Sequence, residues 1–145
     1  MRTILLSMIA VSTFLSADFS RDNNGIVQDS KTGLFWQDDY SDNGDSVKSA
    51  NWTDAIDYCE TLSLNSQTDW RLPNKKELLS IVNYDTYTPS INSVFQKNTS
   101  GNYWSSTTYA SYTNYAWLVN FNLGYTVYSD KSGNGRRVRC VRAGQ

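Results

Sequence analysis

The sequence predicts a small α+β domain, and three observations support this class. Aromatic residues make up 14% of the 145-residue chain, a composition that favours strands and irregular loops over a helical bundle. Two segments in the first half carry apolar residues at helical spacing, and four short segments in the second half read as strands. The length is enough for one domain and too short for two.

The first 17 residues are expected to be a secretory signal peptide. Arg2 precedes an apolar run from Ile4 to Leu15, and small residues end the segment at Ala17. This run is too short and wrongly flanked for a stable membrane span. We therefore expect an exported protein, periplasmic or secreted to the cell surface, with a single domain over residues 18–145. A retained N-terminal anchor is the alternative.

The first elements of the domain are a hairpin and a helix. An apolar pair, a polar turn and a second apolar stretch predict a β-hairpin over residues 26–36. After an acidic loop, residues 52–62 carry apolar side chains at the spacing of one helix face. Asn51 can cap this helix, with Asp54 three residues later as a short analogue of a capping box. The same spacing turns Cys59 towards the core.

A second helix and a set of antiparallel strands follow. Asn74 and Glu77 stand at the spacing of a capping box, ahead of a buried helix face that begins at Leu78. Residues 83–101 show no clean period and are expected to be a long irregular segment. The expected strands cover residues 103–107, 116–121, 125–128 and 137–142. A turn at Asn122–Gly124 is expected to join the middle two.

The two cysteines are expected to form one disulfide. In an oxidising compartment, a Cys59–Cys140 bond would close a loop that spans most of the mature chain. On the chain-entropy model such a loop stabilises the fold by about 4 kcal/mol. A metal site would need further Cys or His ligands, and the chain contains no His. A catalytic Cys would need a nearby base, and none is evident.

Five segments in order carry a family resemblance: "DSKTGLFWQ", "WTDAIDYCETL", "DWRLPNKKEL", "YWSSTTY" and "VRCVRAGQ". Together they closely resemble the Lcl C-terminal domain family, named for a bacterial collagen-like adhesin, from about Asn24 to the end of the chain. That family is related to the C-type lectin-like fold. The resemblance implies two helices packed on short antiparallel strands with long irregular loops. It also implies a disulfide between the first helix and the last strand, where Cys59 and Cys140 lie.

The resemblance also indicates where a ligand would bind. Neither the Glu-Pro-Asn or Gln-Pro-Asp loop nor the Trp-Asn-Asp strand of calcium-dependent lectins occurs, so the calcium-mediated sugar site is not carried over. In the lectin-like fold the late loops form the usual ligand-facing end. The candidate binding residues there are Tyr109, Tyr112, Asn114 and Tyr115. Tyrosine suits such a surface because it gives amphipathic contact area with little entropy to lose. Trp117 is expected to pack mainly in the core.

Charge is distributed unevenly along the chain. Residues 18–60 carry ten acids and three bases, a net of −7, while residues 61–145 carry four acids and nine bases, a net of +5. Such asymmetry indicates either a surface facing a polyanion or two halves that neutralise each other within the fold. The basic candidates are Arg136, Arg137 and Arg139. On one strand, Arg137 and Arg139 would share a face that binds sulfate, phosphate or carboxylate, or that pairs with the acidic half.

The acidic loop is a weak candidate for a calcium site. Its carboxylates are Asp38, Asp39, Asp42 and Asp45. The loop lacks the terminal Glu of an EF-hand, because the twelfth residue from Asp39 is Ala50. A solvated acidic loop is the favoured interpretation, and no cofactor is expected.

These observations predict an exported, non-catalytic recognition module, adhesin-like, that binds a glycan, a polyanion such as a glycosaminoglycan, or a surface protein. A chain without His offers no evident acid–base pair or activated nucleophile, so an enzyme is the least favoured class. A structural or self-assembling envelope protein is the alternative, and a homo-oligomer stays open. We expect no nucleic-acid partner and no membrane span after removal of the signal.

Overall fold

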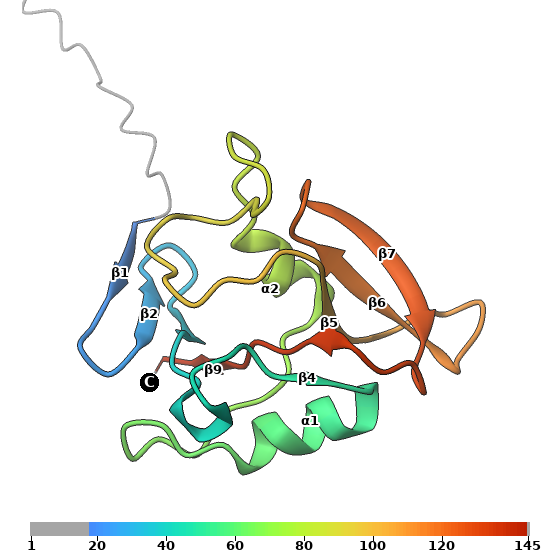
Figure 1. Cartoon of the computed structure of the whole chain (residues 1–145), viewed down its shortest axis with the longest axis horizontal. Coiled ribbons are helices and arrows are strands. Elements are labelled where there is room, and N and C mark those ends of the chain that lie inside the picture. Colours follow the sequence, from blue (N-terminus) through green and yellow to red (C-terminus); the bar gives the residue numbers. More distant parts are fainter. Residues whose placement is uncertain (1–17, 145) are drawn as a thin grey trace, which may run out of the picture.

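The computed structural model describes residues 18–144, which form two β-sheets and two short α-helices (Figure 1). The four-stranded sheet has the order β1-β2-β3-β9, and the five-stranded sheet has the order β4-β8-β5-β6-β7. The predicted α+β class is therefore confirmed, with strands predominating. The predicted signal peptide, residues 1–17, lies outside the described residues. Within the described part of the chain, neither helix has the length and apolar character that crossing a membrane requires.

The four-stranded sheet joins the beginning of the domain to its end. Its strands are β1 (Phe19–Arg21), β2 (Ile26–Asp29), β3 (Leu34–Gln37) and β9 (Val141–Ala143). The predicted hairpin is confirmed as β2 and β3, which pair antiparallel with Val27 opposite Trp36. Strand β1 was not predicted from the sequence. On the other side of β3, Trp36 lies opposite Val141 of β9.

The five-stranded sheet contains three of the predicted strands. Its strands are β4 (Ser49–Ala50), β5 (Asn102–Thr108), β6 (Tyr115–Asn120), β7 (Tyr125–Asp130) and β8 (Arg136–Arg137). The β6–β7 turn needs Gly124, which has a φ of 82° and leaves no room for a Cβ, because that atom would lie 2.5 Å from a methyl carbon of Val82. The expected hairpin at this turn is confirmed.

The fourth predicted strand, 137–142, is wrong as a single element. The structure divides it into β8 and β9, which belong to different sheets. Between them the Val138 N–H donates to the carbonyl of Lys48 at 2.9 Å. The Val141 N–H and carbonyl both bond to the backbone of Arg71 at 2.9 Å. The chain therefore crosses from one sheet to the other, and the period-2 alternation assumed for one strand does not hold across it.

Both predicted helices are present and capped as expected. Helix α1 (Trp52–Thr61) follows Asn51, whose side-chain oxygen accepts the Asp54 N–H at 2.9 Å. Helix α2 (Lys75–Ser80) has a complete capping box, in which the Asn74 side chain accepts the Glu77 N–H and the Glu77 carboxylate accepts the Asn74 N–H. A one-turn 3₁₀-helix, η1 (Ser41–Asn43), lies in the acidic loop.

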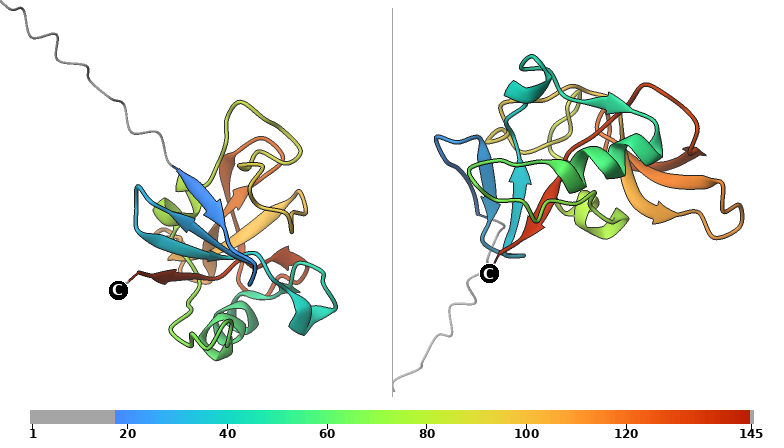
Figure 2. Two further views of the ribbon diagram at one scale, coloured as in Figure 1. Left: turned by 90° about the vertical axis from the view of Figure 1, so that its left-hand side faces the viewer. Right: turned by 90° about the horizontal axis from the view of Figure 1, so that it is seen from below.

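The helices cover opposite faces of the five-stranded sheet. Ala116 and Leu118 of β6 belong to the core cluster that includes Ala55 and Cys59 of α1. Val119 belongs to the second cluster, which includes the buried residues of α2. Seen from below, α1 crosses in front of the sheets (right-hand view of Figure 2). The second cluster does not include Tyr115 and Trp117 at the start of β6, whose side chains are only partly buried.

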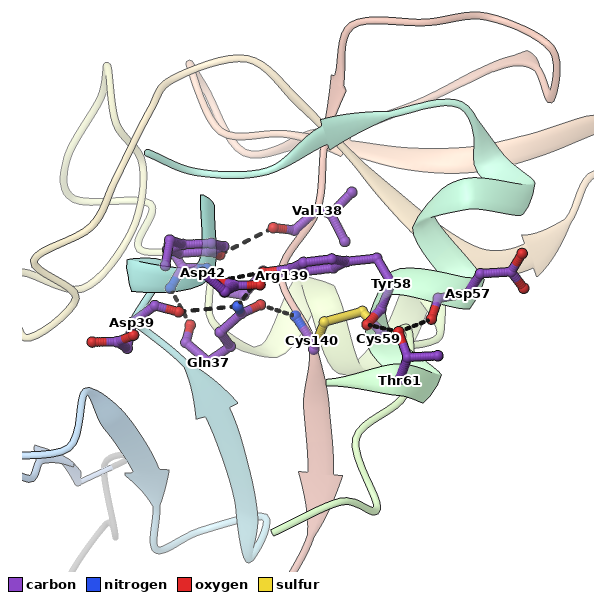
Figure 3. The surroundings of a disulfide bond; sticks show 11 residues. Gln37, Asp39, Asp42, Asp57, Tyr58, Cys59, Thr61, Val138, Arg139 and Cys140 are labelled. Atoms are coloured by element: carbon purple, nitrogen blue, oxygen red, sulfur yellow. Dashed lines mark hydrogen bonds between the residues drawn. A yellow bond between two sulfur atoms is a disulfide. The ribbon is translucent and has the colours of Figure 1, made fainter. Parts of the chain in front are cut away.

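The predicted Cys59–Cys140 disulfide is present (Figure 3). It joins α1 to the crossing between β8 and β9, with 81 residues of sequence separation. Gln37 reinforces this junction: its side-chain oxygen accepts the Cys140 N–H at 3.2 Å, and its amide donates to the Tyr58 hydroxyl at 2.8 Å. Gln37 at the end of β3 therefore bonds to both segments that the disulfide joins.

Candidate functional site

Five aromatic side chains form a cluster at one end of the five-stranded sheet, which we call the aromatic shelf. Its members are Tyr109, Tyr112, Tyr115, Trp117 and Tyr128. The rings of Tyr109 and Tyr128 stack with their centroids 4.4 Å apart and their planes 3° apart. Trp117 stands edge-on to both, with centroid distances of 5.1 and 5.7 Å. Because each ring is held by its neighbours, the shelf is preorganised.

The backbone fixes the positions of these rings. Strands β6 and β7 pair in a register that sets Trp117 opposite Tyr128. The loop between β5 and β6, orange at the right of Figure 1, is closed by hydrogen bonds at 2.9 Å from Tyr109 N–H to the Tyr115 carbonyl and from Tyr115 N–H to the Tyr112 carbonyl. Tyr112 is 63% exposed and Tyr128 52% exposed. The shelf therefore presents aromatic surface to solvent.

Lys75 lies against the shelf, whereas Lys131 lies on the α1 side of the shelf's loop, with its ammonium 4.0 Å from the ring centroid of Trp52. The Lys75 ammonium lies 4.1 Å from the ring centroid of Trp117, at the start of α2. The Lys131 ammonium donates to the Thr108 hydroxyl at 2.9 Å and to the Thr113 carbonyl at 2.8 Å, which holds the β5–β6 loop against the end of β7. Lys75 takes part in none of the ion pairs among the described residues. Its positive charge is thus available beside the rings.

The structure brings the four predicted loop residues together. All three predicted tyrosines belong to the shelf, and the Asn114 amide donates to the Asp130 carboxylate at 3.4 Å on its rim. Hydrogen bonds from the backbone and hydroxyl of Ser132 lower the pKa of Asp130, so this carboxylate is ionised at neutral pH. The rim therefore offers an amide, a carboxylate and the Lys75 ammonium around an aromatic centre.

Sequence reasoning missed two members of the shelf. Trp117 was expected in the core, but its side chain is only partly buried and contacts the tyrosines. Tyr128 was not considered. The predicted turn at Asn122–Gly124 could have revealed both residues, because a tight hairpin closed there places Trp117 and Tyr128 on facing strands.

The three candidate arginines do not form one basic surface, which corrects the shared-face prediction. Arg139 is 1% exposed and lies in the interior. Arg136 and Arg137 are neighbours on β8, so their side chains point to opposite faces of the sheet. Arg136 donates to the Ser129 hydroxyl and to the Asn134 carbonyl, each at 3.2 Å. Only Arg136 and Arg137 keep partial exposure.

Arg139 is held by several partners inside the protein, although its Nε has no hydrogen-bond partner among the described residues. Its guanidinium donates to the carbonyls of Gln37 and Lys97, each at 2.6 Å, and to the side chain of Asn98 at 3.1 Å. It also forms an ion pair with Asp38, and it lies 4.7 Å from the ring centroid of Phe95. The alternative interpretation, that the basic end pairs with the acidic half, therefore holds for Arg139, but in the core.

The four acidic residues considered for calcium do not converge on a common point. Asp38 is buried and paired with arginines. Asp39 accepts from the Ser41 hydroxyl at 2.6 Å, and this hydrogen bond lowers its pKa. Asp42 accepts from the Tyr58 hydroxyl, and Asp45 pairs with Lys97. Within residues 18–144 no group of three or more Asp, Glu, Cys or His residues could hold a metal ion.

A shallow pocket of about 340 Å³ lies between α1 and β4, on the side of the molecule near the disulfide. Lys48, Asp54 and Asp57 give it mixed charge, and Tyr58 forms part of its wall. Burial raises the pKa of Tyr58 well above its ordinary value, and the hydroxyl is engaged by Gln37. The pocket is therefore lined mainly by polar and charged groups, whereas the shelf presents an extended aromatic surface.

Fold and site together define a disulfide-bonded α+β domain that exposes a preorganised aromatic surface beside lysine. The family model of the Lcl C-terminal domain matches residues 25–142. The chain therefore belongs to the Lcl C-terminal domain family, and the resemblance found in the sequence is confirmed. The comparison with curated proteins gives no significant match.

Proposed function

We propose that this protein is an exported, non-catalytic recognition module of the C-type lectin-like kind, adhesin-like in role, which binds a glycan on the aromatic shelf. The observation that carries the proposal is the stack of solvent-facing tyrosine rings around Trp117. Export is supported by the disulfide, because such bonds persist in oxidising compartments. Family membership supports a recognition role without specifying a ligand.

The chemistry of the shelf suits a sugar ring. A pyranose presents an apolar face of C–H groups, and the electron-rich face of an aromatic ring attracts such partly positive hydrogens. Tyr112 and Tyr128 offer exposed rings for this contact, while their hydroxyls and the Asn114 amide can bond to sugar hydroxyls. Since the rings already support one another, little side-chain entropy is lost on binding.

Lys75 favours an acidic glycan over a neutral one. It places a cation beside Trp117, whereas the Lys131 ammonium is engaged by the loop and by the Trp52 ring. A sulfate or carboxylate group on the sugar would meet the Lys75 charge while the ring stacks on tyrosine. Part of this attraction would be screened by salt. A surface protein is a competing ligand class, and a purely structural role is the alternative function.

A glycan and glycosaminoglycan array, run with and without calcium, tests the proposal. We compare wild type with Tyr112→Ala and Tyr128→Ala, and use Tyr87→Ala as the control, since Tyr87 is 77% exposed but lies outside the shelf. Loss of one stacking ring is expected to weaken binding about tenfold, which corresponds to roughly 1.4 kcal/mol. Binding should not require calcium. Ligand binding that Tyr87→Ala weakens as much as the shelf variants, or no glycan binding at all, would contradict the proposal.

A further inference from the structure

Strand β7 is the free edge of the five-stranded sheet. It lies last in the order β4-β8-β5-β6-β7, and among residues 18–144 only β6 pairs with it. It has six residues, whereas the other edge strands, β1, β4 and β9, have three, two and three. Figure 1 shows β7 on the outside of the sheet. This edge is therefore the longest one at which an additional strand could pair.

The register identifies the backbone groups that face outward from β7. Residues 115–120 of β6 pair with 130–125 of β7 without a break, and the Lys131 N–H donates to the Asn114 carbonyl at 2.9 Å in the same register. In an antiparallel ladder, hydrogen-bonded residues alternate along a strand. Thr126, Tyr128 and Asp130 consequently direct their N–H and carbonyl groups away from β6. The Asp130 carbonyl already accepts the Gly133 N–H at 3.0 Å.

Between Tyr125 and Tyr128 the edge carries none of the usual protections against pairing. Natural edge strands are commonly blocked by lysine, proline, a bulge or a covering segment. Strand β7 has the sequence YTVYSD, its register with β6 has no bulge, and none of its residues is fully buried. After β7 the chain leaves towards β8, on the far side of β5, with the Lys131 carbonyl accepting the Trp52 N–H at 3.0 Å. It returns to the edge only at Asp130, through the Gly133 N–H, and leaves residues 125–128 uncovered.

We infer that β7 pairs antiparallel with β7 of a second copy of this chain, around a twofold axis at Tyr128. Only registers that set even-numbered residues opposite one another align the outward backbone groups of both copies. Centred on Tyr128, the pairing matches Thr126 with Asp130 of the second copy twice, where the hydroxyl can donate to the carboxylate. Centred on Asp130 it would oppose two carboxylates, centred on Thr126 or Val127 it would leave Asp130 without a β7 partner, and centred on Ser129 it would set Asp130 opposite Tyr128. In the register centred on Tyr128 the Asp130 carbonyl accepts a second hydrogen bond beside that from Gly133.

The occupant is a second copy because the edge is self-complementary in this register. A twofold interface uses the same patch on both subunits. The five-stranded sheet would continue into the sheet of the second copy, and the two Tyr128 side chains, each stacked on Tyr109 of its own chain, would become neighbours. Two aromatic shelves would then form one surface, which raises avidity for a repeating ligand. The pairing itself does not depend on the proposed function.

Sedimentation equilibrium of the intact chain, over about 1 to 500 µM to reach a small interface, tests the pairing. Wild type is expected to show a reversible monomer–dimer equilibrium. Thr126→Pro removes an outward N–H without removing a bond to β6, and should be monomeric over the same range. Thr126→Val keeps the N–H and should still dimerise. A wild type that is monomeric throughout, or a Thr126→Pro variant that associates like wild type, would overturn the inference.

Cysteine cross-linking tests the register and stays informative if Thr126→Pro does not fold. In the inferred dimer, residue 128 faces itself with a Cα separation of about 5.5 Å, within the range of a disulfide. Tyr128→Cys should therefore give a covalent dimer on mild oxidation. Tyr125→Cys is the matched control, because two copies of residue 125 would lie about 20 Å apart along the strands. Equal cross-linking of both variants, or of neither, would overturn the register.

Discussion

Asp38 and Arg139 form an ion pair in the interior, with Nη1 3.0 Å from Oδ1 and both side chains fully buried. The other oxygen of Asp38 accepts from Arg21 Nε at 2.6 Å and from the Gln96 N–H at 2.9 Å. Its first oxygen also accepts the Lys97 N–H at 3.0 Å. One carboxylate therefore joins β1, the end of β3, the long irregular segment and the crossing to β9.

Removing either partner of this pair is expected to destabilise the fold strongly. Arg139→Leu or Asp38→Asn leaves a buried charge without its partner, and such changes cost about 3–5 kcal/mol of unfolding free energy. Urea denaturation followed by tryptophan fluorescence measures the loss. The matched control is Asp69→Asn at the exposed Asp69–Arg142 pair, where we expect little change. Equal losses at the two pairs would contradict a central role for Asp38.

The disulfide is expected to supply a large share of the stability. Replacing Cys59 and Cys140 together by Ala opens a loop of 81 residues of sequence separation. On the chain-entropy model, this lowers the unfolding free energy by about 4 kcal/mol. Denaturant titration of the double variant measures the change, and non-reducing mass spectrometry of the wild type should link the two cysteine peptides. Free thiols in exported protein would contradict the prediction.

Stability is expected to fall in acid through Glu77. Burial alone would raise its pKa, but hydrogen bonds from Arg71, at 2.7 Å, and from the Asn74 N–H outweigh burial and lower it. A lowered folded-state pKa contributes stability above the unfolded-state value, and this stability is lost as the pH falls through the folded-state pKa. The ordinary pKa of a glutamate side chain is 4.5, so the loss of stability is expected below this pH.

Glu77→Gln isolates this contribution. At pH 7 the variant should be less stable than wild type by about 1 kcal/mol, since Arg71 is partly exposed and its pairing is screened. The difference should shrink as the pH falls below 4.5, the ordinary pKa of the glutamate. Urea titrations at several pH values between neutral and strongly acidic follow it. A difference in unfolding free energy that stays constant down to strongly acidic pH would assign the loss to packing instead of charge.

Retention on heparin should depend on Lys75 more than on other surface lysines. Lys75→Ala removes the cation beside Trp117, and we expect elution at lower salt than for wild type. Lys31→Ala is the matched control, since it removes the same charge from the exposed β2–β3 turn of the other sheet. Equal elution of the two variants would show that retention follows net charge. Replacing Arg136, Arg137 and Arg139 together would not test the predicted polyanion-binding surface, because Arg139 lies in the core.

Elements with local signals could be predicted from the sequence. Asn74 and Glu77 determine a helix start by their own hydrogen bonds, and the Asn122–Gly124 turn determines a hairpin, so α2 and β6–β7 were found correctly. Strand β1 was not found, because three residues carry no pattern and form a strand only by pairing with β2. The division of β8 from β9 likewise depends on which sheet each half meets.

Burial of charge was the other limit on prediction. Alternation predicted that Arg137 and Arg139 share a face opposite Val138, and this is wrong, because the chain leaves the sheet between them and Arg139 is buried like Val138. Nothing near Arg139 in sequence indicates that Asp38, 101 residues away, lies against it. The shelf was predicted only in part, again because sequence distance hides contacts. Its three loop tyrosines are close in sequence and were predicted, while Tyr128 joins them only across the hairpin and was missed.

The pairing of β3 with β9 determines when this protein can fold. The four-stranded sheet is complete only when residues 141–143 have been synthesised. Arg139 and Cys140 come directly before these residues in the sequence, so the buried ion pair and the disulfide also form late. Contacts of such long sequence separation form late and slow the folding of the whole domain. Under the proposed export, this dependence on the last strand would delay closure of the core until the whole chain has been transported.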